Sequence, residues 1–314
     1  MRKLIATLGI AAALAFPNSA FAQEKLTLLL DWFINPDHGP LIIAREKGFF
    51  AAQGLEVEMV EPADPSAPPK LVAAGQADLA VSYQPQLHVQ VAEGLPLTRI
   101  ATLVATPLNS LVVLEDGGVQ SIADLKGKKV GFSVGGFEDV LLGTMLQKHG
   151  LSIDDVELVN VNFSLSPSLI SGQVDAVIGA FRNFELNQMD IVQRPGRAFY
   201  VEEEGVPTYD ELIVVAKTGT EGNPAYRKFI DAVEAATSYM INHPQESWEI
   251  FKATDAKLDD ELNKRAWADT LPRFALRPGA LDKTRYEAFA AFLKDAGMIE
   301  SQPALDTYAV ELPR

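Results

Sequence analysis

The 314-residue chain contains no cysteine. This absence excludes disulfide bonds, a thiol nucleophile and a lipid anchor attached through cysteine. Burial of apolar side chains must therefore hold the fold together, and a chain of this length with 47% hydrophobic residues has enough of them. The length fits two domains.

Basic residues are few relative to acidic ones. The chain has 27 Lys and Arg residues against 42 Asp and Glu residues, which gives a net charge of −15. A surface with this excess of negative charge repels phosphate backbones, so we do not expect nucleic acid as a partner.

Long hydrophobic runs are also missing, except at the N-terminus. There, two basic residues precede an apolar stretch at residues 4–16, and Ala20 and Ala22 form a small-x-small ending. This pattern predicts a secretory signal peptide at residues 1–22, cleaved after Ala22, because the apolar stretch is too short to span a bilayer comfortably. We expect the mature chain to work in a bacterial periplasm without a membrane anchor. A retained N-terminal anchor is the alternative.

Two segments about a hundred residues apart resemble each other. Residues 70–83 and residues 168–180 each read as the end of an apolar helix, the pattern Gly-Gln-x-Asp and a β-prone run. The pattern is also explained as a local turn, in which the glycine supplies the left-handed end of the helix. Its repetition predicts two similar α/β lobes with a cleft between them.

Strands and helices alternate along most of the chain. The expected strands of the first lobe are at residues 26–31, 55–61 and 78–83, and those of the second lobe are at residues 130–134, 156–161 and 175–179. Expected helices include residues 40–47 and 137–149. Right-handed crossovers would make the strands of each lobe parallel and would gather the loops that follow them at one edge of the sheet.

The lobes are expected to be interleaved in the chain. We expect lobe 1 at residues 23–115 and 210–314, and lobe 2 at residues 116–209. In this interpretation the strands at 111–114 and 211–216 belong to lobe 1, and the strand at 198–203 begins the return to that lobe. The chain then crosses near residues 114–116 and near residues 209–212, and two crossings form a hinge. After residue 223 the pattern is helical, with Pro224 and Pro244 suited to first-turn positions and Trp248 and Trp267 suited to packing.

Polar and aromatic side chains gather in the loops that follow the expected strands. Open α/β sheets bind ligands at these carboxyl ends. The candidate ligand-binding residues are Asp31, Trp32, Asn35, His38, Ser82, Tyr83, Gln84, Gly135, Gly136, Phe137, Arg182, Asn183 and Glu185. The aromatic rings would stack on a ring, while the amides and the carboxylate would form hydrogen bonds in its plane. The set predicts a site for a small planar heterocycle.

Several candidates also have a purely structural interpretation. Trp32 would equally fill the core of its lobe, Asn35 would begin a turn before a proline, and Tyr83 would end its strand. Glu185 discriminates best between the two interpretations, because an acid next to Phe184 either faces solvent or needs a partner.

No catalytic or cofactor motif is present. The chain has neither G-x-G-x-x-G nor G-x-x-x-x-G-K-[ST], so binding of a nucleotide phosphate is poorly supported, although Gly135 and Gly136 could hold an anion with their N–H groups. The four histidines are scattered without metal-ligand spacing, and no serine lies in a G-x-S-x-G motif. We therefore expect no enzyme activity, no cofactor and no metal.

Several spaced motifs together resemble a known family, the thiamine pyrimidine-precursor binding proteins of ABC importers. The motifs lie at residues 30–39, 44–50, 82–86, 181–186 and 201–212, and the resemblance runs from about residue 26 to residue 216. It implies a two-lobed periplasmic binding protein fold of type II, in which each lobe is a mostly parallel sheet flanked by helices and the ligand cleft lies between the lobes.

The resemblance also implies a function. Such a protein closes on a small heteroaromatic ligand and presents it to the permease of an ABC transporter, as a monomer. By resemblance, Trp32, Asn35, His38, Tyr83 and Glu185 fall at ligand-contacting positions. An aminopyrimidine presents a ring nitrogen beside an amine, and the carboxyl group of Glu185 could meet both with parallel hydrogen bonds.

Other ligands and one other activity remain as alternatives. Riboflavin or another heteroaromatic would need a larger cavity, and a sulfonate-like or nitrate-like anion would need cations, for which Arg182 is the candidate. The resemblance also extends to fungal enzymes that make the pyrimidine. This chain lacks their cysteine-rich motif, and His38 has no convincing lysine beside it.

Overall fold

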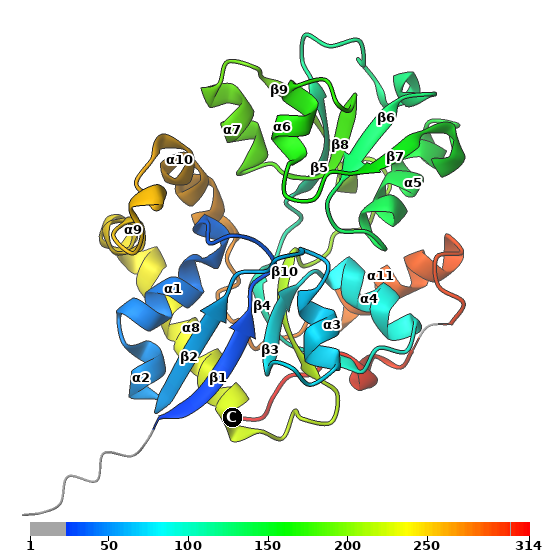
Figure 1. Cartoon of the computed structure of the whole chain (residues 1–314). Coiled ribbons are helices and arrows are strands. Elements are labelled where there is room, and N and C mark those ends of the chain that lie inside the picture. Colours follow the sequence, from blue (N-terminus) through cyan, green and yellow to red (C-terminus); the bar gives the residue numbers. More distant parts are fainter. Residues whose placement is uncertain (1–22, 302) are drawn as a thin grey trace, which may run out of the picture.

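Two five-stranded sheets form the centres of two lobes (Figure 1). The computed structural model describes residues 23–301 and 303–314, so the expected signal peptide at residues 1–22 lies outside the described residues. The first sheet has the order β2-β1-β3-β10-β4 and the second has the order β7-β6-β8-β5-β9.

The two sheets have the same topology. In sheet 1, β1 is parallel to β2 and β3, while β10 is antiparallel to β3 and β4. In sheet 2, β6 is parallel to β7 and β8, while β5 is antiparallel to β8 and β9. The strands of sheet 1 are β1 (Glu24–Leu29), β2 (Leu55–Val60), β3 (Leu79–Ser82), β4 (Leu97–Val104) and β10 (Leu212–Lys217). Those of sheet 2 are β5 (Asn109–Leu114), β6 (Lys129–Phe132), β7 (Glu157–Asn160), β8 (Ala176–Phe181) and β9 (Gly196–Tyr200).

The repeated Gly-Gln-x-Asp pattern leads into the equivalent strands β3 and β8. Gly75 and Gly172 both have φ of 75°, the left-handed conformation that ends each preceding helix. The aspartates have equal roles, because Asp78 accepts a hydrogen bond from the Thr27 N–H on β1 and Asp175 accepts one from the Lys129 N–H on β6. The expected two-lobed α/β architecture is confirmed.

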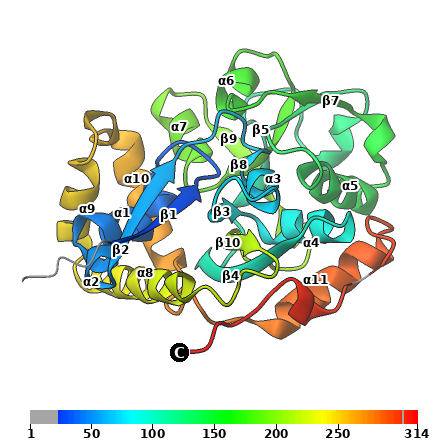
Figure 2. The same ribbon diagram turned by 60° about the horizontal axis from the view of Figure 1, so that its bottom comes forward.

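Helices cover both lobes. The first lobe carries α1 (Gly39–Glu46), α2 (Phe49–Ala52), α3 (Pro68–Ala73), α4 (Gln84–Ala92), α8 (Pro224–Asn242), α9 (Pro244–Lys252), α10 (Glu261–Thr270) and α11 (Lys283–Asp295). The second lobe carries α5 (Glu138–Lys148), α6 (Leu165–Ile170) and α7 (Glu185–Ile191). The view in Figure 2 brings forward α8 and α11 on the outer side of the first lobe. The expected helical region after residue 223 is confirmed, with a proline in the first turn of α8 and of α9.

Two strands lie in a different lobe from the one expected. The strand at 111–114 is part of β5, and the strand expected at 198–203 is β9, which ends at Tyr200; both belong to sheet 2, where β5 pairs with β8 and β9. Because β5 is buried along almost its whole length, its apolar end at residues 111–114 carries no sign of which strands lie beside it. The expected place of residues 111–114 in lobe 1 is therefore wrong, as is the return to lobe 1 at 198–203, although β9 lies within the bounds 116–209 expected for lobe 2. We propose crossings at residues 105–108 and 201–211, in place of a first crossing near 114–116.

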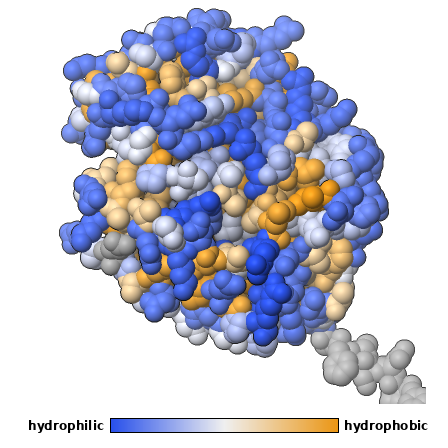
Figure 3. All heavy atoms as spheres, turned by 180° about the vertical axis from the view of Figure 1, so that it is seen from behind, coloured by the Kyte–Doolittle hydropathy of each residue, from blue (hydrophilic) through white to orange (hydrophobic). Residues whose placement is uncertain are grey.

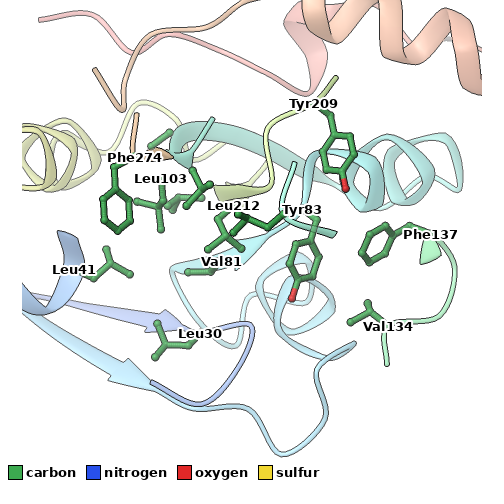
Figure 4. Close-up of a cluster of buried hydrophobic side chains, with 14 of the residues drawn as sticks. Leu30, Leu41, Val81, Tyr83, Leu103, Val134, Phe137, Tyr209, Leu212 and Phe274 are labelled. Carbon is green, nitrogen blue, oxygen red and sulfur yellow. The ribbon is translucent and has the colours of Figure 1, made fainter. Parts of the chain in front are cut away.

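Apolar packing continues from one lobe to the other. Figure 4 shows Leu30, Val81 and Tyr83 of the first lobe in one cluster with Val134 and Phe137 of the second. Trp248 and Trp267 are buried and pack on each other with ring centroids 5.8 Å apart, which confirms their expected packing role.

The surface differs from this interior. The face in Figure 3 is mainly hydrophilic, with hydrophobic groups in separate areas. Within residues 23–301 and 303–314, no helix combines the length and the apolar composition needed to cross a membrane.

Candidate ligand-binding site

A pocket lies between the lobes at the carboxyl ends of β1, β3, β6 and β8. It encloses about 440 Å³ of empty space, part of which is continuous with solvent. The lining residues are Asp31, Trp32, Asn35, Asp37, Tyr83, Val134, Phe137, Glu138, Leu165, Gly179, Phe181, Phe184 and Glu185. Both lobes therefore contribute to one site, as expected for open α/β sheets.

Asp31 fixes the ring of Tyr83 at one wall of the pocket. Its Oδ2 accepts a hydrogen bond from the Tyr83 hydroxyl at 2.8 Å, and its Oδ1 lies 2.9 Å from His38 Nε2. The Asn35 N–H donates to His38 Nδ1 at 3.3 Å, so the ring proton is on Nε2 and is donated to Asp31. Burial and the Asp31 carboxylate raise the pKa of Tyr83 well above its ordinary value, so the phenol stays protonated.

Aromatic rings from the two lobes meet at the pocket. Tyr83 stacks on Phe137 with ring centroids 5.1 Å apart and an angle of 25° between the planes. Phe181 meets the same tyrosine edge-on at 6.4 Å. Trp32 of the first lobe contacts Phe163 of the second at 4.7 Å. These contacts close the lobes on each other and leave flat apolar walls beside the cavity.

Glu138 is a buried carboxyl at the start of α5, with 3% of its surface exposed. Its Oε2 accepts hydrogen bonds from the N–H groups of Ser133 at 2.8 Å and Val134 at 3.1 Å. Burial raises the pKa of Glu138 to about 8, although these two bonds act in the opposite direction. Gly179 makes room for this carboxyl group, because a Cβ at position 179 would lie 2.5 Å from Glu138 Oε1.

Glu185 repeats this arrangement at the start of α7. Its Oε2 accepts a hydrogen bond from the Phe181 N–H at 2.7 Å, four residues earlier, as Glu138 does with Val134. Burial raises the pKa of Glu185 to about 7. Each glutamate thus curls back over the loop that joins a parallel strand to its helix, and each lines the pocket.

Asp37 links the two lobes. Its Oδ1 accepts hydrogen bonds from Asn183 Nδ2 at 2.6 Å and from Thr270 Oγ1 at 2.9 Å. Asn183 precedes α7 in lobe 2, while Thr270 ends α10 in lobe 1. Burial raises the pKa of Asp37 to about 6, and the hydrogen bonds from its partners oppose that rise.

The ionisable groups that line the pocket are all acids. Four carboxyl groups line it, and no lysine or arginine does among the described residues. The candidate cation Arg182 turns away: it forms an ion pair with Glu202, donates to the backbone carbonyls of Leu108 and Asn109, and lies over the ring of Tyr200. In the described part of the chain, no group of three or more His, Asp or Glu side chains is placed to hold a metal ion. The pocket therefore suits a ligand that brings hydrogen-bond donors or positive charge.

The family is decided by comparison with known proteins. The model of the family described as NMT1/THI5 like matches residues 35–247, which is more than half of the chain. The chain belongs to the NMT1/THI5-like family. A Haemophilus influenzae protein, provisionally named a thiamine biosynthesis protein, is 54% identical over 313 residues, covering 99% of this chain and 100% of its own length.

Other relatives in the comparison differ in activity. The formylaminopyrimidine-binding protein of Halalkalibacterium halodurans is 33% identical over 228 residues, covering 72% of this chain and 69% of its own. A 4-amino-5-hydroxymethyl-2-methylpyrimidine phosphate synthase of Saccharomyces cerevisiae is 26% identical over 267 residues, covering 78% of this chain and 76% of its own length. Among solved structures, the alkanesulfonate-binding protein SsuA of Xanthomonas axonopodis superposes with a TM-score of 0.73 at 16% identity, covering 92% of this chain and 99% of that one. The last comparison shows that the fold is that of a periplasmic binding protein.

The expected site residues of this NMT1/THI5-like chain separate into two groups. The residues that line the pocket are Asp31, Trp32, Asn35, Tyr83, Phe137 and Glu185. The others, His38, Ser82, Gln84, Gly135, Gly136, Arg182 and Asn183, do not line it. His38 lies behind Asp31, and Asn183 bonds to Asp37 across the lobes.

The remaining expected residues have structural partners. The Ser82 hydroxyl donates to Gln86, and Gln84 accepts a hydrogen bond from the Asp210 N–H. The Gly136 N–H, which was expected to bind an anion, instead donates to the carboxylate of Asp139 at 3.0 Å.

Several lining residues were not among the candidates from the sequence, and two of them, Asp37 and Glu138, are acidic. One signal could have indicated the second. The same dipeptide, Phe-Glu, follows β6 at residues 137–138 and β8 at residues 184–185. Only Glu185 is among the candidates from the sequence. The sequence offers no comparable sign for Asp37, which a short turn places in the pocket wall.

Proposed function

We propose that the protein binds an aminopyrimidine precursor of thiamine outside the cytoplasm and delivers it to the permease of an ABC transporter, without transforming it. The observation that carries the proposal is the pocket wall, which combines aromatic rings with four carboxyl groups and no cation among the described residues. An aminopyrimidine complements this wall, because its flat ring can stack on the aromatic side chains and its amine and basic ring nitrogen can pair with the carboxyl groups.

Glu185 is the proposed partner of the amine edge. A carboxylate can accept from the amine and from a protonated ring nitrogen, while a neutral carboxyl can accept from the amine and donate to an unprotonated nitrogen. Because burial raises the pKa of Glu185 to about 7, both forms are within reach near neutral pH. Trp32, Tyr83 and Phe137 would contact the ring, each aromatic pair contributing about 0.5 to 1.5 kcal/mol beyond area burial.

The alternatives fit the pocket less well. A sulfonate-like or nitrate-like anion would meet four carboxyl groups, and Arg182 is already paired with Glu202. Riboflavin would have to place three fused rings where Tyr83 and Phe137 stack with centroids 5.1 Å apart. A synthase that holds pyridoxal phosphate on a lysine would need that lysine in the pocket, and none lines it in the described chain. The relative named as a formylaminopyrimidine-binding protein supports a binding role.

The first experiment identifies the ligand. Mass spectrometry of small molecules released from the purified protein should find an aminopyrimidine. Isothermal titration calorimetry with hydroxymethylpyrimidine, its formylaminomethyl analogue, thiamine, riboflavin and taurine should show 1:1 binding of a pyrimidine. Preferred binding of riboflavin or taurine would reject the proposal, and uptake of the bound pyrimidine by cells with and without the gene would test delivery.

The second experiment tests Glu185. Glu185→Gln removes the charge at nearly constant shape, so we expect the affinity for the pyrimidine to fall by about 1.5 to 3 kcal/mol, or roughly 10- to 150-fold in Kd. Glu157→Gln removes an exposed charge from β7 of the same lobe and should leave Kd unchanged. An unchanged Kd in Glu185→Gln would remove this residue from the site.

A further inference from the structure

An arginine of the second lobe fastens both crossings at the ends nearest to that lobe. Arg182 donates to the carbonyl oxygens of Leu108 at 3.2 Å and Asn109 at 3.1 Å, where the first crossing enters β5. The same guanidinium group pairs with Glu202, near the start of the second crossing. Because Arg182 lies in the loop after β8, these two ends are fixed to the second lobe.

An arginine of the first lobe fastens the opposite ends. Arg285 of α11 donates to the Ala105 carbonyl at 2.8 Å and forms an ion pair with Asp210. Asp210 also accepts a hydrogen bond from the Thr102 hydroxyl on β4 at 2.8 Å. A change of angle between the lobes is therefore left to the short stretches between the fastened ends, at about residues 106–107 and 205–209.

Glu211 reaches across these stretches. It directly precedes β10 of the first lobe and is fully buried. Its Oε2 accepts hydrogen bonds from the N–H groups of Leu108 and Asn109, which are fixed to the second lobe, and from the Tyr209 hydroxyl at 3.1 Å. Hydrogen bonds weaken steeply when their geometry is lost, so a rotation of one lobe against the other weakens this contact.

One of the residues that Glu211 holds also supports the pocket wall. Asn109 accepts a hydrogen bond through its Oδ1 from the Gly179 N–H at 3.0 Å. Gly179 lines the pocket and lies directly against the carboxyl group of Glu138. The hinge contact and the pocket wall are thus connected through a single side chain.

We propose that Glu211 is a positioning residue for closure: it ties the first-lobe end of one crossing to the second-lobe end of the other, and thereby stabilises the closed arrangement and slows release of the bound molecule. Glu211 is not among the residues that line the pocket, so its effect on a ligand passes through closure and not through contact. The inference rests on movement of the lobes and does not depend on which small molecule the pocket binds.

Energy transfer between fluorescent labels on the two lobes measures closure directly. Because the chain has no cysteine, Glu58→Cys on β2 and Glu157→Cys on β7 supply one exposed labelling site in each lobe. Glu211→Leu removes the acceptor at similar size. We expect it to lower the closed fraction of the ligand-free protein and to speed the dissociation of 4-amino-5-hydroxymethyl-2-methylpyrimidine about three- to tenfold.

A conservative variant separates the hydrogen bonds from a general loss of packing. Glu211→Gln keeps one carbonyl oxygen that can accept from the same donors, so its closed fraction and its dissociation rate should stay within about twofold of the wild type. Thr237→Val is the control for loss of a buried hydrogen bond elsewhere, because the Thr237 hydroxyl donates to the Val233 carbonyl within α8. It should change neither quantity.

Tyr209→Phe keeps the test decisive if Glu211→Leu does not fold. It removes one of the three donors to the Glu211 oxygen, and we expect dissociation about two to three times faster. Unchanged closure and dissociation in the variants that fold, or an equal loss in Glu211→Gln and Glu211→Leu, would overturn the inference and leave the proposed function intact. If the wild type binds no pyrimidine, the proposed function fails, and the ligand-free closed fraction alone decides the role of Glu211.

Discussion

Glu138 and Glu185 hold acid groups in the cleft without a neighbouring cation. Each accepts backbone hydrogen bonds through one oxygen, at the start of a helix. Helix N-termini favour negative charge, but burial opposes it more strongly here and raises the pKa of both carboxyl groups. The folded chain is therefore most stable when these two acids keep their protons.

This leads to a pH dependence of stability. With its pKa raised to about 8, Glu138 keeps a proton in the folded chain that it has lost in the unfolded chain, so the free energy of unfolding falls as pH rises toward 8. Buried His88 acts with the opposite sign, because its pKa is lowered to about 3, but its contribution stops changing above about pH 6.5. We expect Glu138 alone to lower the free energy of unfolding by roughly 1 to 2 kcal/mol between pH 6.5 and 8.

Urea unfolding of the ligand-free protein at the two pH values measures this change. Glu138→Gln stays neutral at both and should lose much of the decline, leaving the part that Glu185 and Glu211 contribute, since the pKa of each is raised to about 7. Glu157→Gln, exposed on β7, should retain the full decline. Identical declines in the wild type and Glu138→Gln would show that Glu138 is ionised in the folded chain.

The sequence could place at the edge of the pocket those side chains that directly follow a strand. Asp31, Trp32 and Tyr83 follow β1 and β3 within a few residues and reach the pocket wall. It could not decide which neighbour faces the cavity and which lies behind it. His38 bonds instead to Asp31 of its own loop, and Gln84 accepts a hydrogen bond from the Asp210 N–H, whose position in space the sequence spacing does not reveal.

At the level of elements, α7 and α10 connect the lobes beside the pocket (Figure 1). Arg265 of α10 pairs with Asp190 of α7, and Asn187 of α7 donates to Asp269 of α10 at 2.8 Å. The side chains of the ion pair are largely exposed, so it contributes little. The buried contact of Thr270 with Asp37 and Asn183 is the stronger connection.

Thr270→Val should loosen this connection at constant shape. It removes the hydroxyl that bonds to Asp37 and Asn183, so we expect the pyrimidine to dissociate about three to ten times faster while its association rate changes little. Stopped-flow tryptophan fluorescence measures both rates. Thr254→Val removes a hydroxyl that bonds only to the Phe251 carbonyl, and it should leave the rates unchanged. Equal dissociation rates in the wild type and Thr270→Val would contradict a closing role for the α7–α10 contact.

The order of elements could be predicted because each carries its own pattern. Prolines begin α8 and α9, and glycines at positive φ end the helices before β3 and β8. The lobe to which β5 and β9 belong could not be predicted. Pairing depends on which strand lies alongside, and neither the apolar end of β5 nor the half-buried β9 carries a residue that specifies its neighbour.

For the whole molecule, the two crossings define how the lobes can move. Glu211 joins the crossings, because its Oε2 accepts hydrogen bonds from the N–H groups of Leu108 and Asn109. The ring contacts at the pocket, between Tyr83 and Phe137, are those of a closed arrangement. Closed lobes around a pocket imply that the ligand enters through an opened state.

Small-angle X-ray scattering can detect this opening. We expect the radius of gyration of the ligand-free protein to exceed the value calculated for the closed structure and to fall when the bound pyrimidine is added. Taurine at the same concentration should cause no change. A radius that already equals the closed value and stays constant would contradict hinge closure.

The insertion of β10 between β3 and β4 has a consequence for assembly. The two flanking strands are synthesised more than a hundred residues before the strand that joins them. During synthesis or translocation the first sheet therefore remains split, while the strands of the second sheet, all within residues 109–200, are already complete. Folding should therefore finish in the first lobe. A protease added during synthesis should cleave the first lobe at a stage when the second lobe already resists cleavage.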